Sequence, residues 1–487
     1  MTTSNHPRLR GRLLTAIAYA AIASVPGYAF AAPQDGASET SEIIVTAQKR
    51  TQSVNSVPIS ITAATGETLL SRGVTSTSDL AKIVPGLTAQ PSPFNTPVYT
   101  LRGIGFYDST LAAPPTVAVY TDEVPLPYSA MTKAAALDVA RVEVLKGPQG
   151  TLFGQNTTGG AINYVAARPT DNFAAGLDTS FGRFSTLDVQ GFVSGPVASN
   201  MRARLSARTI QSDDWQESFT RNDTLGAQHM TQGRFLLDWD VSDPLSVTFN
   251  LNGWKDTSEN QAPQRWSGYI SAPTATPQRQ ALSINYPLVP SNARAADWGT
   301  DLATPKRDDY FVQGSVRMDY ALSDAIKVTS ITAYERYKTD SYQEYDGTTL
   351  RIADVFSRGH INTFSQELRI AGETDRLNWV IGGNYEADNT YDLLTYRSAD
   401  STTTDQGPFS WDATRFYADQ KVRTTSVFAN VEYEIVQRLS LTGGMRYTDS
   451  RRKFVGCSED TRDVMPDVTS AGPFFNAVFG VSIPPGG

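Results

Sequence analysis

Residues 138–164 read DVARVEVLKGPQGTLFGQNTTGGAINY, and this stretch decides the fold. Two β-prone runs, Val142–Leu145 and Ala161–Val165, flank a glycine-rich loop that begins at Gly147. The loop lacks the Lys-Ser/Thr pair with which a phosphate-binding loop holds phosphate and magnesium. The stretch therefore predicts two strands joined by a structural loop, and no nucleotide site.

The surrounding residues 56–168 predict a compact mixed α/β domain, punctuated by glycine and proline. We expect short helices over 66–71 and 78–84, and further short strands over 99–104 and 117–121.

Residues 172–487 have a different sequence pattern. Polar and apolar residues alternate within segments that are separated by turns. In Ser426–Ile435, for example, Val427 and Val431 share one face with Tyr433. Such alternation fits a transmembrane barrel strand, with one face toward lipid and one toward a polar lumen. It fits a soluble β-sandwich equally well. About eleven strands are expected in this part of the chain, and they begin near 174, 186, 201, 231, 245, 310, 326, 361, 378, 424 and 438.

The lengths of the connections favour the barrel. Tight turns alternate with long links that span 212–230, 256–308, 340–360 and 395–421. Outer-membrane barrels have short turns at one end and long loops at the other, whereas a sandwich has no reason to sort its loops in this way.

The N-terminal residues 1–31 have the form of a cleaved secretory signal. Arg8, Arg10 and Arg12 precede the apolar run Leu13–Ala23, and Ala29-Phe30-Ala31 is a small-x-small cleavage site. An anchor helix is the alternative, but Pro26 and Gly27 interrupt the run before it reaches spanning length. Residues 32–55 then predict a flexible leader that contains one short β-prone run, Glu42–Ala47. That run is either a buried first strand or a peptide that adds to a partner's sheet.

Composition excludes several functional classes. The chain has 487 residues, a formal charge of -8, one cysteine and three histidines, one of which lies in the signal. No intrachain disulfide is possible, and a zinc site of Cys and His ligands is not expected. No catalytic motif is found, so we expect no enzyme activity, no cofactor, no metal site and no nucleic-acid partner.

Residues 138–164 closely resemble the plug signature of TonB-dependent receptors, a family of bacterial outer-membrane transporters. Leu101–Gly105 resembles that family's "RG" motif, Val117–Val124 resembles its next strand, and Glu42–Ala47 resembles its TonB box. The plug positions carried over by this resemblance are Arg102, Gly103, Arg141, Glu143, Lys146, Gly147, Pro148, Gly150, Gly154, Gly159 and Gly160. Arg102, Arg141 and Glu143 are expected either to tie the plug to the barrel or to pair within the plug.

The resemblance implies an α+β plug inside an antiparallel barrel of about 22 strands. It also implies active transport, in which the inner-membrane protein TonB binds Glu42, Ile43, Ile44, Val45, Thr46 and Ala47 and pulls on the plug. Ferric siderophore is the default ligand, and a carbohydrate or other small organic ligand is the alternative. Candidate ligand contacts are Phe106, Tyr107, Asp108 and Tyr128.

The sequence departs from the family pattern after the eleventh strand. An odd count of about eleven strands cannot close such a barrel, so we expect a C-terminally truncated receptor with an open, curved sheet around the plug. Cys457 is expected in a loop. A truncated receptor that does not transport is therefore a further alternative. A passive porin would lack both the box and the plug.

Overall fold

The computed structural model describes residues 43–459 and 472–480, except 47, 51, 75, 93–95, 109, 268–271, 300–303 and 407–408. The expected signal peptide and the leader up to residue 41 lie outside the described residues, as do Glu42 and Ala47 of the expected TonB box.

The expected plug contains a five-stranded mixed sheet in the order β3-β9-β10-β7-β8. Its strands are β3 (Ile61–Thr65), β7 (Val117–Thr121), β8 (Val124–Leu126), β9 (Val139–Lys146) and β10 (Gly160–Ala166). A second, three-stranded sheet comprises β4 (Leu87–Pro91), β5 (Pro97–Leu101) and β6 (Ile104–Gly105). The helical elements are α2 (Gly66–Ser71), η1 (Ser78–Lys82) and η2 (Ser129–Thr132).

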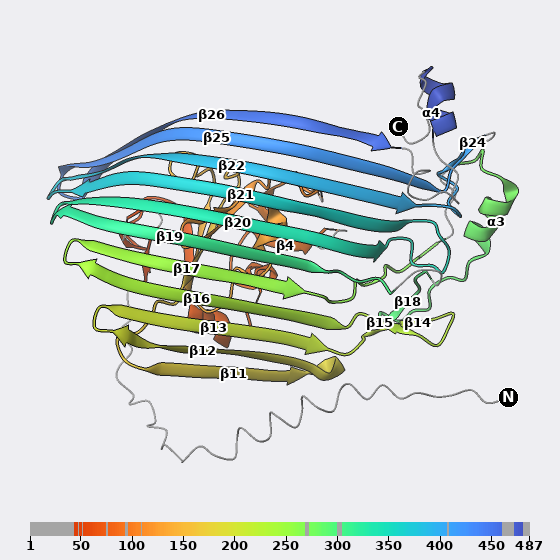
Figure 1. Cartoon of the computed structure of the whole chain (residues 1–487), viewed down its shortest axis with the longest axis horizontal. Coiled ribbons are helices and arrows are strands. Elements are labelled where there is room, and N and C mark those ends of the chain that lie inside the picture. The colour runs from red at the N-terminus through yellow and green to blue at the C-terminus, as the bar shows by residue number, and fades with distance from the viewer. Residues whose placement is uncertain are drawn as a thin grey trace, which may run out of the picture. The chain divides into compact units, whose positions relative to one another are not determined.

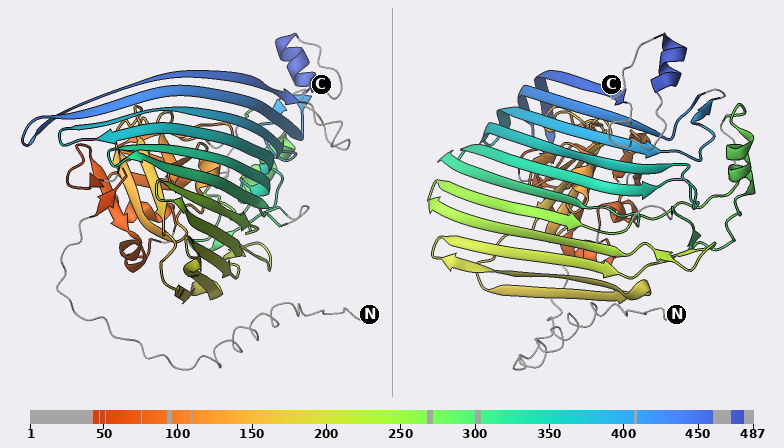
Figure 2. Two further views of the ribbon diagram at one scale, coloured as in Figure 1. Left: turned by 60° about the vertical axis from the view of Figure 1, so that its left-hand side comes forward. Right: turned by 45° about the vertical axis from the view of Figure 1, so that its right-hand side comes forward.

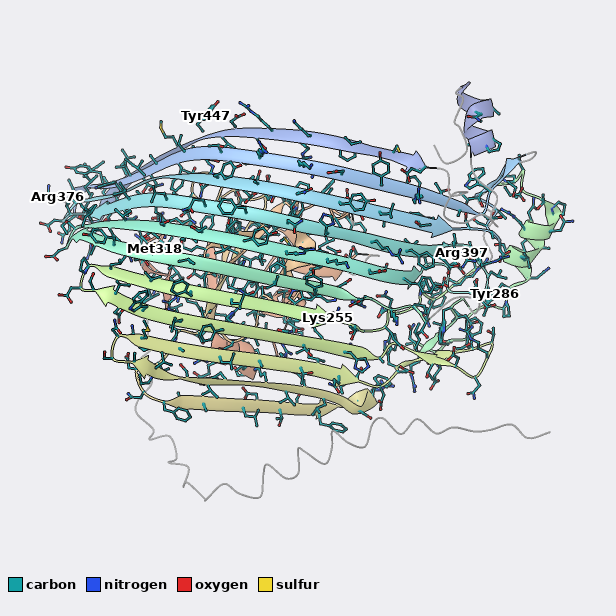
Figure 3. The ribbon with its side chains drawn as sticks, viewed as in Figure 1. Lys255, Tyr286, Met318, Arg376, Arg397 and Tyr447 are labelled. Carbon is teal, nitrogen blue, oxygen red and sulfur yellow. The ribbon has the colours of Figure 1, made fainter. Side chains whose placement is uncertain are left out.

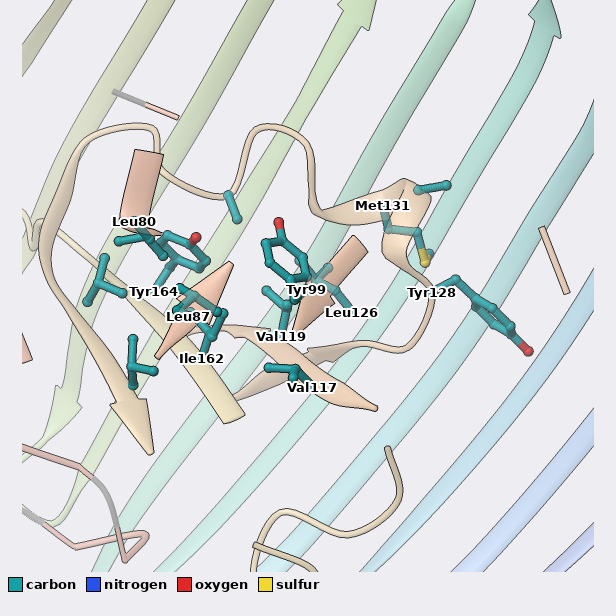
Figure 4. Close-up of a cluster of buried hydrophobic side chains, with 14 of the residues drawn as sticks. Leu80, Leu87, Tyr99, Val117, Val119, Leu126, Tyr128, Met131, Ile162 and Tyr164 are labelled. Atoms are coloured by element: carbon teal, nitrogen blue, oxygen red, sulfur yellow. The ribbon is translucent and has the colours of Figure 1, made fainter. Parts of the chain in front are cut away.

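The plug core is built from side chains of both sheets and of the short helices. Leu80, Tyr99 and Val119 meet Ile162 and Tyr164 in one buried cluster (Figure 4). All five residues of β7 are buried, because this strand lies inside the sheet between β10 and β8. Burying such side chains stabilises the fold by about 1.5–3 kcal/mol each.

Eleven long strands form one antiparallel sheet, in which each strand pairs with the next along the chain. They are β11 (Ala174–Gly182), β12 (Thr186–Ala198), β13 (Met201–Ser212), β16 (Gln228–Ser242), β17 (Leu245–Asp256), β19 (Asp309–Ser323), β20 (Ile326–Glu344), β21 (Asp354–Glu373), β22 (Leu377–Arg397), β25 (Ala413–Val436) and β26 (Leu439–Glu459). Among the described residues, β11 and β26 have no partner strand on their outer edges. The sheet curves around the plug (Figures 1 and 2), which confirms the expected open architecture.

Connections between the strands differ at the two ends of the sheet. One end has tight turns such as Asp243-Pro244 and Gln437-Arg438, and we name it the short-turn end. The other, the long-loop end, carries four long connections. They hold β14 (Gln216–Ser218), β15 (Thr224–Leu225), α3 (Pro277–Asn285), β18 (Ala295–Ala296), β23 (Asp405–Gln406) and β24 (Phe409–Ser410). In Figure 3, Arg376 marks the short-turn end and Tyr286 the long-loop end.

The outward face of the sheet carries exposed apolar side chains near the short-turn end. On β25, Val427, Val431 and Tyr433 are exposed and point away from the plug, as their alternation predicted. Farther along the same face, toward the long loops, Lys421 and Arg423 are exposed. An apolar band bounded by charge is what contact with a bilayer requires.

Three expectations about local structure were wrong. The strands β21 and β25 begin at Asp354 and Ala413, several residues before their expected starts, because cross-strand pairing continues beyond the apolar pattern. The expected strand over 99–104 is a β5–β6 hairpin. Cys457 is exposed but lies in β26 rather than in a loop, because β26 pairs with β25 as far as Glu459.

No helix in the described part of the chain is long and apolar enough to cross a membrane. The last described helix is α4 (Gly472–Phe479).

Candidate energy-coupling and ligand-binding sites

The segment expected to be the TonB box is held against the plug. Ile44 and Val45 form β1 (Ile44–Val45), which pairs antiparallel with β2 (Gln52–Ser53). Val45 is fully buried, whereas the Ile44 side chain is 42% exposed. In this structure the segment is therefore a docked strand.

Glu143 of β9 binds the residue that follows this strand. Thr46 donates its backbone amide to Glu143 Oε1 at 2.9 Å, and its hydroxyl lies 3.1 and 3.0 Å from the two carboxylate oxygens. Arg141 Nε lies 2.8 Å from the same Oε1. Glu143 is fully buried. Its charge is tolerated there because a cation and hydrogen-bond donors surround it.

The motif charges Arg102, Arg141 and Glu143 make their described contacts within the plug and to the box. The Arg102 guanidinium donates a 2.7 Å hydrogen bond to the Ser60 hydroxyl. Of the two roles left open by the sequence, these contacts match pairing within the plug.

The ion pairs between plug and barrel wall involve other residues. Lys49 Nζ lies 3.5 Å from Glu123 and 3.2 Å from Glu367 of β21. Glu123 also pairs with Arg317 of β19 at 2.6 Å and with Arg369 of β21 at 2.7 Å. Burial raises the pKa of the Glu123 carboxyl, but Arg369, Arg317 and Lys49 together outweigh it and hold the pKa well below its usual range.

Further plug–wall bonds lie on the side of β13 and β16. Asp138 accepts two 2.6 Å hydrogen bonds from the Arg204 guanidinium. Arg234 donates to the Leu137 carbonyl. Sequence reasoning missed these anchors, because the pairing of an acid in the plug with an arginine on a strand leaves no local pattern. The sequence did draw attention to Lys49 and Arg50, because they follow the box closely.

The glycines of the motif shape the loop between β9 and β10. Gly147 (φ +93°) lies in the left-handed region, and its amide donates to the Gly159 carbonyl at 3.0 Å. Gly160 has φ +149°, and a Cβ there would overlap the Leu145 carbonyl oxygen. Lys146 pairs across the strands with Gly160. In the same loop, after Pro148, the amide of Gly154 donates to the carbonyl of Gly150. These residues are placed as structural elements of the plug.

The four candidate ligand residues occupy different places. Phe106 and Tyr107 are 51% and 60% exposed, and Asp108 accepts hydrogen bonds from the Thr110 amide and hydroxyl at 2.8 and 3.0 Å. Tyr128 is only 4% exposed. Burial raises the pKa of its hydroxyl, and the nearby Thr390 and Gln420 of the barrel wall oppose that shift.

A cavity of about 630 Å³ lies between the plug and the long-loop end of the wall. Of the four candidates only Tyr107 lines it. Other lining residues come from the plug, the strand ends and the long loops: Lys133, Trp215, Met230, Asp256, Glu259, Arg307 and Tyr345. We name this cavity the vestibule.

The charges of the vestibule are paired or bonded to backbone. Lys133 and Arg307 both contact Asp256. Burial, reinforced by Arg307, lowers the pKa of the Lys133 ammonium, although Asp256 opposes the shift. Glu259 accepts hydrogen bonds from the amides of Gly226 and Ala227 at 2.8 and 3.2 Å. Burial raises its pKa against those two donors.

A buried plug lies on the polar face of a sheet with a lipid-facing band, docks an N-terminal strand at one end and faces a vestibule at the other. These features define a plug domain beside an open, antiparallel barrel-type sheet. Residues 53–161 match the family model described as TonB-dependent Receptor Plug Domain.

Two curated proteins are similar to this chain in sequence. The pesticin receptor of Yersinia pestis is 30% identical over 219 residues, which is 43% of this chain and 31% of that protein. The ferripyoverdine receptor of Pseudomonas aeruginosa is 21% identical over 439 residues, which is 86% of this chain and 51% of that protein.

Solved structures share the fold. The ferric yersiniabactin uptake receptor of Yersinia pestis superposes with a TM-score of 0.65 at 19% identity, covering 82% of this chain and 61% of that one. The ferripyoverdine receptor of Pseudomonas aeruginosa gives 0.65 at 16% identity, covering 85% and 56%. Residues 53–161 match the plug domain of TonB-dependent receptors, and the chain resembles proteins named as siderophore receptors, of which it spans about a third to two thirds. Members of this family are receptors of the Gram-negative outer membrane rather than enzymes.

Proposed function

We propose that this receptor imports a ferric siderophore across the outer membrane, driven by TonB. In this proposal residues 1–31 are removed on export, and TonB binds residues 42–47 in the periplasm. The kinship with receptors named for ferripyoverdine and ferric yersiniabactin supports the choice of ligand.

One observation carries the proposal: the plug joins the docked box to the vestibule. The box lies near the short-turn end, where Arg50 pairs at 2.6 Å with Glu432 of β25, four residues before that strand ends. Tyr107 faces the vestibule at the other end. A ligand bound outside and a partner bound inside would therefore act on the same small domain.

TonB binding by strand addition requires free backbone groups on Ile44 and Val45. In the docked state β2 occupies one edge of this strand, and Glu143 occupies the amide of Thr46. Coupling therefore needs release of β1 from β2 and of Thr46 from Glu143.

The test is uptake of ⁵⁵Fe-labelled siderophores by cells that express the complete gene, with and without TonB. Uptake should require both TonB and residues 42–47. Deletion of residues 33–38 from the leader is the matched control and should leave uptake intact. Uptake that persists without TonB would overturn active transport.

A carbohydrate is the second candidate ligand, because Tyr107, Trp215 and Tyr345 line the vestibule and aromatic faces suit sugar rings. TonB-dependent accumulation of a labelled oligosaccharide, with no accumulation of ferric siderophores, would favour it.

A further inference from the structure

A cavity of about 60 Å³ lies between the plug and one side of the barrel wall. On the plug side it is lined by the β7–β8 region and by Phe153 and Gln155. On the wall side it is lined by residues of β21, β22 and β25, including Asn384 and Ser426. We name it the side cavity.

The side cavity has polar side chains among its mostly apolar lining. Within the described residues, Asn384 Oδ1 and Arg446 Nη1 lie there buried and without a hydrogen-bond partner. Buried polar groups without partners are costly, so water or a polar solute that contacted these two atoms would be favourably bound there.

Lys49 closes this cavity from the plug side. Its side chain is 2% exposed, with Nζ between Glu123 and Glu367 and 5.2 Å from the centre of the Phe153 ring. Glu123, Glu367 and Phe153 all line the same cavity. Removing Lys49 would take away the cation that links the box segment to Glu367 of the wall, whereas Arg317 and Arg369 would still hold Glu123.

Lys49 is also the wall contact closest in sequence to the box. It follows Thr46 by three residues, and its amide donates to the Thr46 carbonyl at 3.1 Å in a turn where Lys49 has φ +60°. Three residues span about 10 Å when extended, so a pull on Thr46 reaches Lys49 after a short displacement. Arg50, bound to Glu432, follows next.

The opposite side of the plug is fastened differently. There Asp138 binds Arg204 of β13, and Arg234 of β16 donates to the Leu137 carbonyl. These anchors lie more than ninety residues after Thr46 in the sequence and are separated from it by strands of the plug sheet. Another plug–wall cavity, of about 110 Å³, lies against β12, but none of its lining residues belongs to residues 43–50.

We propose that the passage for the ligand opens at the side cavity, between the plug and strands β21, β22 and β25, and that Lys49 is the first restraint on this opening that a pull on the box releases. The proposal rests on the proposed function, because it assigns the place where a TonB-driven pull acts. Withdrawal of residues 43–50 would free Glu367 and Glu123 from Lys49. The side of the plug held by Asp138 would stay attached.

The test measures access of a membrane-impermeant maleimide to single cysteines in the receptor expressed from its complete gene. The native thiol is removed by Cys457→Ser, the one cysteine within residues 1–487, together with any cysteine that the complete gene encodes outside them. Ser426→Cys and Thr424→Cys place thiols on the wall of the side cavity. Ser206→Cys is the matched control, because it is equally buried and faces Asp138 on the other side.

Cells receive ⁵⁵Fe-loaded hydroxamate and catecholate siderophores, and labelling and uptake are measured together. We expect labelling at 426 and 424 to rise at least about tenfold in cells with TonB relative to cells without it, because thiol reactivity follows exposure. Labelling at 206 should not change. Lys49→Met should raise labelling at 426 even without TonB.

Several results would overturn the proposal. The first is increased labelling of the cysteine at position 206 without increased labelling at position 426. The second is an equal increase in labelling at both positions. The third is TonB-dependent uptake with no increase in labelling at positions 426 and 424. These results leave TonB-dependent transport intact. Uptake that does not require TonB would instead overturn the proposed function, and the isotope measurement reports that separately.

Discussion

The backbone amide of Thr46 donates a 2.9 Å hydrogen bond to Glu143, a carboxylate that is fully buried in the plug. The same carboxylate binds Arg141. One buried charge therefore joins the segment expected to meet TonB to the central sheet of the plug.

Glu143→Gln should release the box segment. The amide keeps the shape of the side chain but loses the charge that Arg141 and Thr46 share, and hydrogen bonds to charged groups contribute about 1.5–3 kcal/mol. The free fraction of the segment should rise by roughly ten- to a hundredfold. A nitroxide at Ile44→Cys, in the Cys457→Ser background, should report increased mobility.

Glu217→Gln is the control for that release. Glu217 pairs with Arg294 in a long loop and is half-exposed, so the nitroxide at position 44 should not respond to it. Unchanged mobility in Glu143→Gln would show that Glu143 does not hold the segment.

The attachment of the plug to the wall should weaken in acid through Glu123. The pKa of this carboxyl is lower in the folded protein than its ordinary value of 4.5. Its contribution to stability is therefore present above pH 4.5 and is lost as the pH falls through the folded pKa. Glu123→Gln should cost about 3–5 kcal/mol at pH 7, because it leaves buried cations without their counter-charge.

Hydrogen exchange of the plug amides in urea measures this effect at pH 7 and pH 3. The free energy of unfolding of the plug should differ strongly between the native receptor and Glu123→Gln at pH 7, and this difference should be smaller at pH 3. Glu67→Gln, at an exposed carboxylate of α2, should match the native receptor at both values. An equal difference at the two pH values would contradict the assignment to Glu123.

Gly160→Ala should prevent correct assembly of the plug sheet. The new Cβ would lie 2.6 Å from Leu101 Cδ2 and would overlap the Leu145 carbonyl oxygen, in a backbone conformation that alanine disfavours. Gly73→Ala shares the positive φ but meets nothing within 4 Å, so it should cost only about 1–2 kcal/mol. Protease resistance of the plug in isolated membranes compares the two, and equal resistance would refute the steric argument.

Tyr107→Ala should weaken ligand binding at the vestibule by about tenfold. It removes an exposed aromatic face whose contact with the ligand contributes about 1.4 kcal/mol to the free energy of binding. Phe106→Ala is the matched control, since Phe106 is similarly exposed but does not line the vestibule. Equilibrium binding of the ⁵⁵Fe-labelled siderophore that supports uptake gives both affinities in cells without TonB. Equal losses in the two variants would remove the vestibule as the binding site.

The sequence predicted the eleven strands because their signals are local. Period-two alternation identifies Val427 and Val431 as outward-facing whatever the partner strand is. It did not predict where β25 begins, because Lys421 and Arg423 break the apolar face while the backbone pairing continues. Cys457 was misplaced in a loop for the same reason.

The candidate site was only partly predictable. The box and the glycine loop are continuous in sequence, so their positions could be read directly. The pairing of Glu123 with Arg317 and Arg369 joins residues nearly two hundred or more positions apart, and no single sequence signals it. Tyr128, a ligand contact expected from the sequence, is buried beside Gln420 of the wall, a position that depends on the fold.

The length of β25 has a consequence for how a ligand is captured. Fourteen residues, 413–426, lie beyond the apolar band that begins at Val427. At about 3.3 Å per residue and a tilt of about 45°, they raise the long-loop end roughly 30 Å above the hydrocarbon boundary. This exceeds the Debye length of about 8 Å at physiological ionic strength. The surface potential of the lipid headgroups is therefore screened at the long-loop end of β25, and the field that an approaching ligand meets there is set by the receptor's own charges.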